Sequence, residues 1–145
     1  MRRGFGLITA IIILMAVASL MALTISLSSS TVKNTTDIYL KEQAELLARS
    51  ATEYALLAIS GHNNSINCVQ NINITYPTVP PNHTHEANLT IYYIGNSIPG
   101  CANVLDNAIA TNDSNLTVLI DTTVTVNPSI TTEPIRVHRR TLQKP

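Results

Sequence analysis

Residues 2–27 read RRGFGLITAIIILMAVASLMALTISL, and no charged side chain follows Arg3 until Lys33. A helix that crosses a bilayer needs about 20 mainly apolar residues, so residues 5–27 are long enough for a transmembrane segment. The apolar part of a cleaved secretory signal has only about 7–15 residues. The pattern therefore favours a retained membrane anchor over the alternative, a soluble domain secreted after loss of this segment.

The charges around this segment predict its orientation. Arg2 and Arg3 precede it, and the next basic residues are Lys33 and Lys41. The positive-inside rule therefore places the N-terminus in the cytoplasm and most of the chain outside. Small residues recur along the segment at intervals of four, with Leu14 as an interruption: Gly6, Ala10, Ala18, Ala22, Ser26 and Ser30. Such a row either lets helices approach one another closely in lipid, or it simply faces the lipid in an anchor that contacts no other helix.

A helical pattern continues beyond the segment. Apolar residues recur every three or four positions, namely Leu40, Ala44, Leu47, Ala51, Tyr54 and Ala58, which is typical of a helix with one buried face. Gly61 stands where a helix commonly ends. We expect one long helix over residues 5–61, with the hydroxyl-rich residues 28–36 as the place where it would bend or fray.

The motif Arg2-Arg3-Gly4-Phe5, the uncharged run and the amphipathic helix together resemble type IV prepilins and type II secretion pseudopilins. The resemblance covers about residues 1–60. It implies that a prepilin peptidase removes residues 1–4 by cleaving between Gly4 and Phe5, and that Phe5 is then N-methylated. It also implies a pilin-like α+β fold, and as partners other pilin subunits, an assembly ATPase and an inner-membrane assembly platform.

One position departs from the family pattern. Its members usually carry Glu as the fifth residue of the mature chain, where this chain has Thr9. In the family that Glu neutralises the N-terminal amine of a neighbouring subunit, a strong pairing in a low-dielectric environment. Thr9 therefore implies a minor subunit that initiates or tips a filament. The residues 43–51 are similar to the helix of tip pseudopilins, although this chain is shorter than those proteins.

Residues 62–145 have the composition of a β-rich head. Apolar and polar residues alternate over 66–76, 87–93, 116–126 and 135–137, a strand signal, while Pro77, Pro80-Pro81 and Pro99-Gly100 mark loops. We expect a small antiparallel sheet packed on the outer half of the long helix, with one or two helical turns in 102–110. Cys68 and Cys101 predict one disulfide in an exported head; two buried free thiols are the alternative.

No residue pattern marks an enzyme, a cofactor site or a metal site. His83-Thr84-His85-Glu86 resembles a metal cluster, but it lies in a Pro/Asn-rich stretch without a further ligand at a recognisable spacing, so we expect a solvated loop. The net charge of zero gives no argument for nucleic acid. The basic C-terminal residues fit a charged edge strand, although contact with DNA during uptake is the alternative: Arg136, His138, Arg139, Arg140 and Lys144.

Two asparagines are candidate glycosylation sites. Asn88 and Asn115 each belong to an Asn-x-Ser/Thr motif. Each also follows an acidic residue two positions earlier, Glu86 and Asp113 respectively, which is similar to the longer acceptor motif of some bacterial oligosaccharyl transferases. Chance occurrence in an Asn- and Thr-rich head is the alternative.

These observations predict a structural pilin or pseudopilin subunit in a bacterial inner membrane, with its head in the periplasm. Secretion, DNA uptake and adhesion remain open as the activity of the assembled machine. The alternative from another functional class is a non-polymerising, single-pass anchored protein that uses its head as a receptor.

Overall fold

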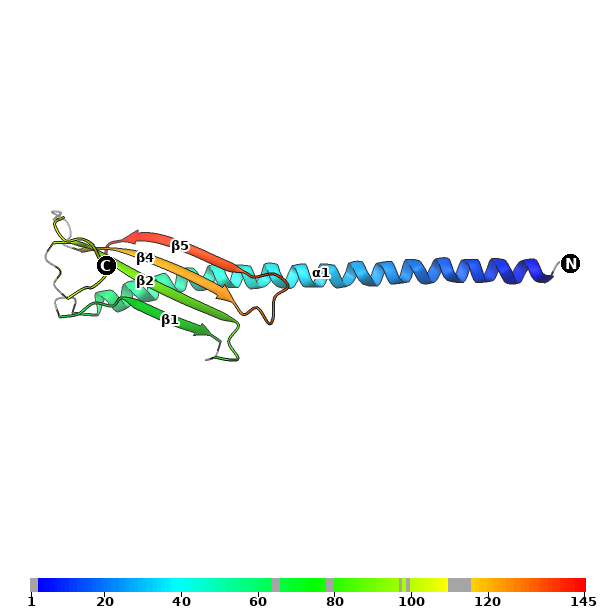
Figure 1. Ribbon diagram of the computed structural model, residues 1–145, viewed down its shortest axis with the longest axis horizontal. Helices are drawn as coiled ribbons and strands as arrows, with labels where there is room; N and C mark the ends of the chain where they lie inside the picture. The colour runs from blue at the N-terminus through cyan, green and yellow to red at the C-terminus, as the bar shows by residue number, and fades with distance from the viewer. Residues whose placement is uncertain (1–2, 64–65, 78–79, 97, 99, 110–115) are drawn as a thin grey trace. The chain divides into compact units, whose positions relative to one another are not determined.

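The computed structural model describes residues 3–63, 66–77, 80–96, 98, 100–109 and 116–145. One long helix, α1 (Arg3–Ser60), is followed by five strands (Figure 1): β1 (Asn71–Tyr76), β2 (His85–Gly95), β3 (Val104–Asp106), β4 (Leu116–Val126) and β5 (Arg136–Gln143). The predicted α+β class is confirmed. The chain divides into two compact units, residues 1–36 and residues 37–145, and α1 contributes to both.

Helix α1 ends where the sequence predicts. The backbone N–H of Gly61 donates to the carbonyl of Leu57 at 3.0 Å, which closes the last turn. The hydroxyl-rich stretch does not interrupt the helix: Thr31, Thr35 and Thr36 each donate to the carbonyl four residues earlier, at 2.9–3.0 Å. These hydroxyls have partners within the helix. Residues 28–36 are helical throughout, so the expected fraying is wrong, while a bend in this stretch stays a prediction.

The sheet has the order β1-β2-β4-β5 with antiparallel pairing throughout, and β3 pairs with β2 in parallel. The predicted antiparallel sheet is confirmed for these four strands. One expectation needs correction: residues 104–106 form a strand, paired in parallel with β2, where helical turns were expected. The physical reason lies in β2, which continues past the end of its pairing with β1. The N–H of Tyr93 donates to the carbonyl of Asn103 at 2.8 Å, so β3 covers an edge that β1 leaves open.

The core lies between α1 and one face of β2 and β4. Alternate residues of both strands are buried, and they face a row of small helix residues with 0–2% exposure: Ala44, Ala48, Ala51 and Ala55. Alanines let the helix approach the sheet closely, and Thr52 and Thr122 add a hydroxyl contact of 3.2 Å between the two layers. The predicted buried stripe was wrong at Tyr54, which is 55% exposed.

Candidate functional site

The N-terminal part of α1 presents a continuous apolar surface. Every Leu, Ile, Met and Val side chain from Leu7 to Leu27 is exposed, from 42% at Val17 to 70% at Met15 and Ile25. The most apolar 18 consecutive residues of this helix have a mean hydropathy of 2.6, and none of them is buried. Soluble monomers rarely expose so large an apolar patch. By length and composition, the helix is able to cross a membrane.

Three hydroxyl groups in this apolar segment form hydrogen bonds with the backbone of the helix itself. Thr9 donates to the carbonyl of Gly6 at 3.0 Å, and Ser19 and Thr24 each donate to the carbonyl three residues earlier at 2.8 Å. A polar group without a partner is costly in lipid, so these bonds lower the cost of burying the three side chains. Thr9, at the usual position of the pilin Glu, is thus a neutral, locally bonded residue.

The predicted cleavage residues lie in the first turn of α1. Gly4 and Phe5 have helical backbone, whereas Met1 and Arg2 are outside the described residues. Cleavage after Gly4 and methylation of Phe5 stay predictions.

The row of small residues forms a spiral ridge on this helix. Residues four apart are offset by about 40° around an α-helix with 3.6 residues per turn. The ridge from Ala18 through Ala22 and Ser26 to Ser30 therefore turns by about 120°. A ridge of this kind contacts a neighbouring helix only where the two cross. It is suited to several crossing neighbours more than to one parallel partner.

The two cysteines are paired in the head. Cys68 and Cys101 form a disulfide with a Cα–Cα distance of 4.9 Å and a sequence separation of 33 residues. The bond connects the segment before β1 to the segment before β3. The predicted pairing of Cys68 with Cys101 is thus found in the structure, at disulfide distance.

The segment His83–Glu86 does not form the solvated loop that was expected, because β2 begins at His85. Neighbouring side chains on a strand point to opposite faces of the sheet. The side chain of His85 therefore lies on the other face from that of Glu86. His85 is 1% exposed, with Nε2 3.1 Å from the carbonyl oxygen of Leu40 and Nδ1 2.8 Å from Oγ1 of Thr84. His85 therefore joins the sheet to α1.

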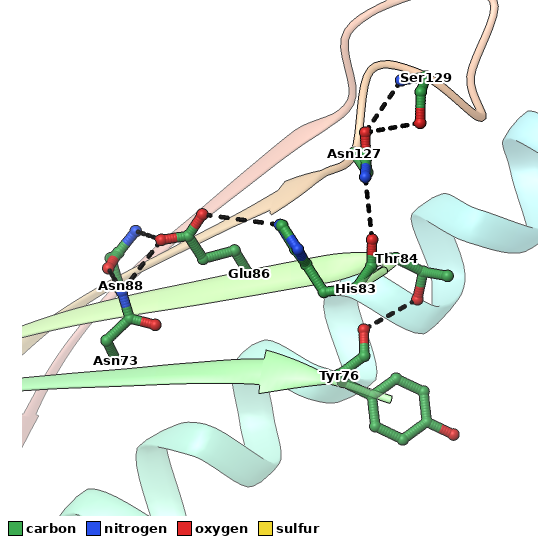
Figure 2. A network of polar contacts seen from close by, with 8 residues as sticks. All are labelled: Asn73, Tyr76, His83, Thr84, Glu86, Asn88, Asn127 and Ser129. Carbon is green, nitrogen blue, oxygen red and sulfur yellow. Dashed lines mark hydrogen bonds and ion pairs between the residues drawn. The ribbon is translucent and has the colours of Figure 1, made fainter. Parts of the chain in front are cut away.

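Because the side chains of a strand alternate, Glu86 points to the face of the sheet opposite to His85. Figure 2 shows Glu86 with its partners. The carboxylate accepts hydrogen bonds from Asn73 at 3.0 Å and Asn88 at 3.2 Å, and His83 Nε2 lies 3.9 Å away. The hydrogen bonds from Asn73 and then Asn88 lower the pKa of Glu86. Asn127 bonds the carbonyl of His83 at 3.0 Å. In the described part of the chain, no group of three or more His, Cys, Asp or Glu side chains could hold a metal ion.

The structure places one of the two candidate glycosylation sites. Asn88 is exposed in the middle of β2 and accepts a hydrogen bond from Asn73 at 2.9 Å while donating to Glu86. A glycan on Asn88 Nδ2 would therefore compete with this network. Asn115 lies outside the described residues.

The basic C-terminal residues lie on and after β5, at one edge of the sheet. Asp121 on the neighbouring strand β4 accepts hydrogen bonds from His138 and Arg140. Burial raises the pKa of Asp121, but the bonds from Arg140 and His138 outweigh this effect and hold it below its ordinary value. Sequence analysis missed this cluster, although Asp121 and Arg140 both fall on outward positions of alternating strands.

We expect Asp121→Asn to lower the free energy of unfolding at pH 7 by up to about 1 kcal/mol, the range of partly exposed ion pairs. Because the folded-state pKa of Asp121 is lowered, its contribution is complete above the unfolded value of about 3.8 and disappears as the pH falls through the folded value. Urea unfolding over a pH series should show the gap between variant and wild type closing on acidification. The exposed Glu133→Gln is the control; a pH-independent gap at Asp121 contradicts the assignment.

Searches with protein-family models, characterised proteins and solved structures found no match to this chain.

Proposed function

We propose that the protein is a structural subunit of a type IV pilus or a type II secretion pseudopilus, anchored by α1 and assembled through it. The observation that carries this proposal is the exposed, uncharged part of α1, which belongs to the same helix that forms one layer of the head core. A helix of 58 residues is several times the average for globular proteins, about 11–12 residues. A head of this size needs only the part from Leu40 to Ile59 for its core.

The remaining part of α1 therefore has another task, and its chemistry fits membrane anchoring followed by helix–helix packing. It carries no charge from Gly4 to Val32, and its small-residue ridge permits close helix crossings. In this proposal the mature chain begins at Phe5, the N-terminus faces the cytoplasm and the head faces the periplasm. Its partners are other subunits, the peptidase, the inner-membrane platform and the ATPase.

Thr9 supports a role as a minor subunit within this proposal. A carboxylate there would offer a charge partner to the N-terminal amine of a neighbour, and the Thr9 hydroxyl, which donates to Gly6, offers none. Such a subunit adds poorly to an existing filament, because the amine it meets stays unpaired in an apolar environment. It is able to occupy the first, tip position, where this pairing is not required.

The cleavage step has a direct test with a matched control. On co-expression with a prepilin peptidase, we expect removal of residues 1–4 from the wild-type chain. Gly4→Leu should block this cleavage, because the resemblance places the cut directly after Gly4. Gly6→Leu should be cleaved normally, because residue 6 lies beyond the bond that is cut and a Cβ there meets no atom within 4 Å that would disturb the helix. Gel mobility and mass of the product give the readout. Equal cleavage of both variants, or none of the wild type, contradicts the proposal and favours the non-polymerising anchored receptor.

A further inference from the structure

The two edges of the sheet differ in how they are protected. β1 and β5 are the terminal strands, and no described strand pairs with the far edge of β1. β5 carries Arg136, His138, Arg139 and Arg140, whereas β1 (NINITY) has no charged residue and no proline. Natural sheets use charges and prolines to prevent further strands from pairing with an edge. By this criterion β5 is a protected edge and β1 is an open one.

The backbone of β1 is set up for further pairing. The N–H of Ile91 on β2 donates to the carbonyl of Gln70, just before β1, at 2.8 Å. Residues of an antiparallel strand alternate between bonding to one neighbour and to the other side. The N–H and C=O groups of Asn71, Asn73 and Thr75 therefore point away from β2. Together they offer the donors and acceptors of a regular ladder.

Apolar space lies beside this edge, between β1 and α1. One cavity of about 410 Å³ is lined by Gln43, Leu46, Leu47, Ser50, Tyr76 and His85. A second cavity of about 410 Å³ is lined by Tyr54, Ile72, Asn73, Ile74 and Thr75. We call these two cavities together the β1 groove. Among the described residues, none that lines these two cavities is acidic, lysine or arginine. The space on the β5 side is lined in part by Glu45, Arg49 and Arg139.

We propose that the β1 groove binds an extended, uncharged segment of a partner polypeptide, which adds to the sheet as a strand beside β1. Main-chain hydrogen bonds to Asn71, Asn73 and Thr75 would give affinity, and apolar side chains at alternate positions would fill the groove, the usual division in strand addition. Leu46 and Tyr54 are 63% and 55% exposed, so both have surface to bury against these side chains.

Self-pairing of β1 in a second copy fits these features less well. An antiparallel pair of two β1 strands in one continuous sheet makes the head parts of the two α1 helices run in opposite directions, which two subunits of one polar assembly cannot adopt. A parallel symmetric pair turns the polar side chains of Asn71, Asn73 and Thr75 towards the partner's apolar groove. A separate polypeptide segment meets neither difficulty. The exclusion of the antiparallel self-pair rests on the proposed function, whereas the open edge and the groove do not.

The probe for a test is a blocked seven-residue synthetic peptide of alternating valine and threonine, with a fluorophore, titrated into the detergent-solubilised full chain. We expect saturable binding that is lost when lysine replaces the valines in the peptide. Thr75→Pro removes one outward N–H and should weaken binding about tenfold, as loss of one hydrogen bond implies. Thr75→Val keeps this N–H and should bind like the wild type.

A second pair of variants tests the groove without touching the sheet. Tyr54→Lys places a charge in the groove at an exposed helix position and should weaken binding by about tenfold or more, because the charge loses water on binding. Glu53→Lys, at the exposed adjacent position that does not line the groove, should leave binding unchanged. Absence of peptide binding, or equal binding by Tyr54→Lys and Glu53→Lys, overturns the proposal. A wild-type dimer that Thr75→Pro converts to a monomer overturns it in favour of a second copy.

Discussion

Replacing Ile13 and Leu20 together by arginine will release the protein from the membrane fraction. The twelve Leu, Ile, Phe and Val residues of 5–27 contribute roughly −4 to −7 kcal/mol to membrane insertion, and each exchange of such a residue for arginine near the centre costs about 3–4 kcal/mol. Two exchanges cost about 6–8 kcal/mol and so offset the whole driving force. One exchange would leave the segment near balance, which is why the test uses two.

The matched control changes two leucines of the same helix outside the apolar segment. Leu46 and Leu57 are exposed to 63% and 70%, as Ile13 and Leu20 are to 63% and 65%, so the two double variants differ in location and not in charge or exposure. Alkaline extraction of membranes followed by immunoblotting measures the integrated fraction. We expect Leu46→Arg/Leu57→Arg to stay in the pellet. If the Ile13→Arg/Leu20→Arg protein stays there equally, residues 5–27 are not the anchor.

Removing the disulfide will have the second-largest effect, and it acts on the head. Cys68 and Cys101 close a loop with a separation of 33 residues, for which the chain-entropy relation gives about 3–4 kcal/mol. Folded domains have a total stability of about 5–15 kcal/mol. Cys68→Ser/Cys101→Ser should therefore unfold at a markedly lower denaturant concentration, with little change in the native spectrum.

Reductant supplies the internal control for this prediction. Circular dichroism at a β-sheet wavelength, during guanidinium unfolding of the full chain in detergent, measures the midpoint. Reductant should shift the wild-type midpoint to that of the double serine variant and leave the variant unaffected. A wild-type midpoint insensitive to reductant and equal to that of the variant would show that the pair does not stabilise the head.

Features that depend on neighbouring residues in sequence were predictable. The uncharged run before Lys33 and the periodic apolar residues from Leu40 fix a long helix locally, and Gly61 marks its end. The alternation in 116–126 likewise coincides with β4. The head contains two cysteines, Cys68 and Cys101, so only one disulfide within the chain was possible.

Features that depend on contacts distant in sequence were missed. β3 exists because β2 extends past β1, a fact of sheet topology that residues 102–110 do not contain. His85 is buried because the carbonyl of Leu40, 45 residues away, accepts its hydrogen bond. Tyr54 falls within the apolar periodicity, yet the buried face is centred on the alanines Ala48, Ala51 and Ala55, so its ring lies at the groove instead. The one sequence feature that could have indicated the groove is that this helix carries more large apolar residues than its buried face holds.

The N-terminus of the mature protein tests the central claim most directly. Intact-mass and N-terminal peptide mass spectrometry of the protein, purified from membranes of cells that carry its own assembly machinery, should give a chain that starts at Phe5 and bears one methyl group on its amine. A membrane-bound chain that still begins at Met1 would contradict the account of a processed pilin-like subunit.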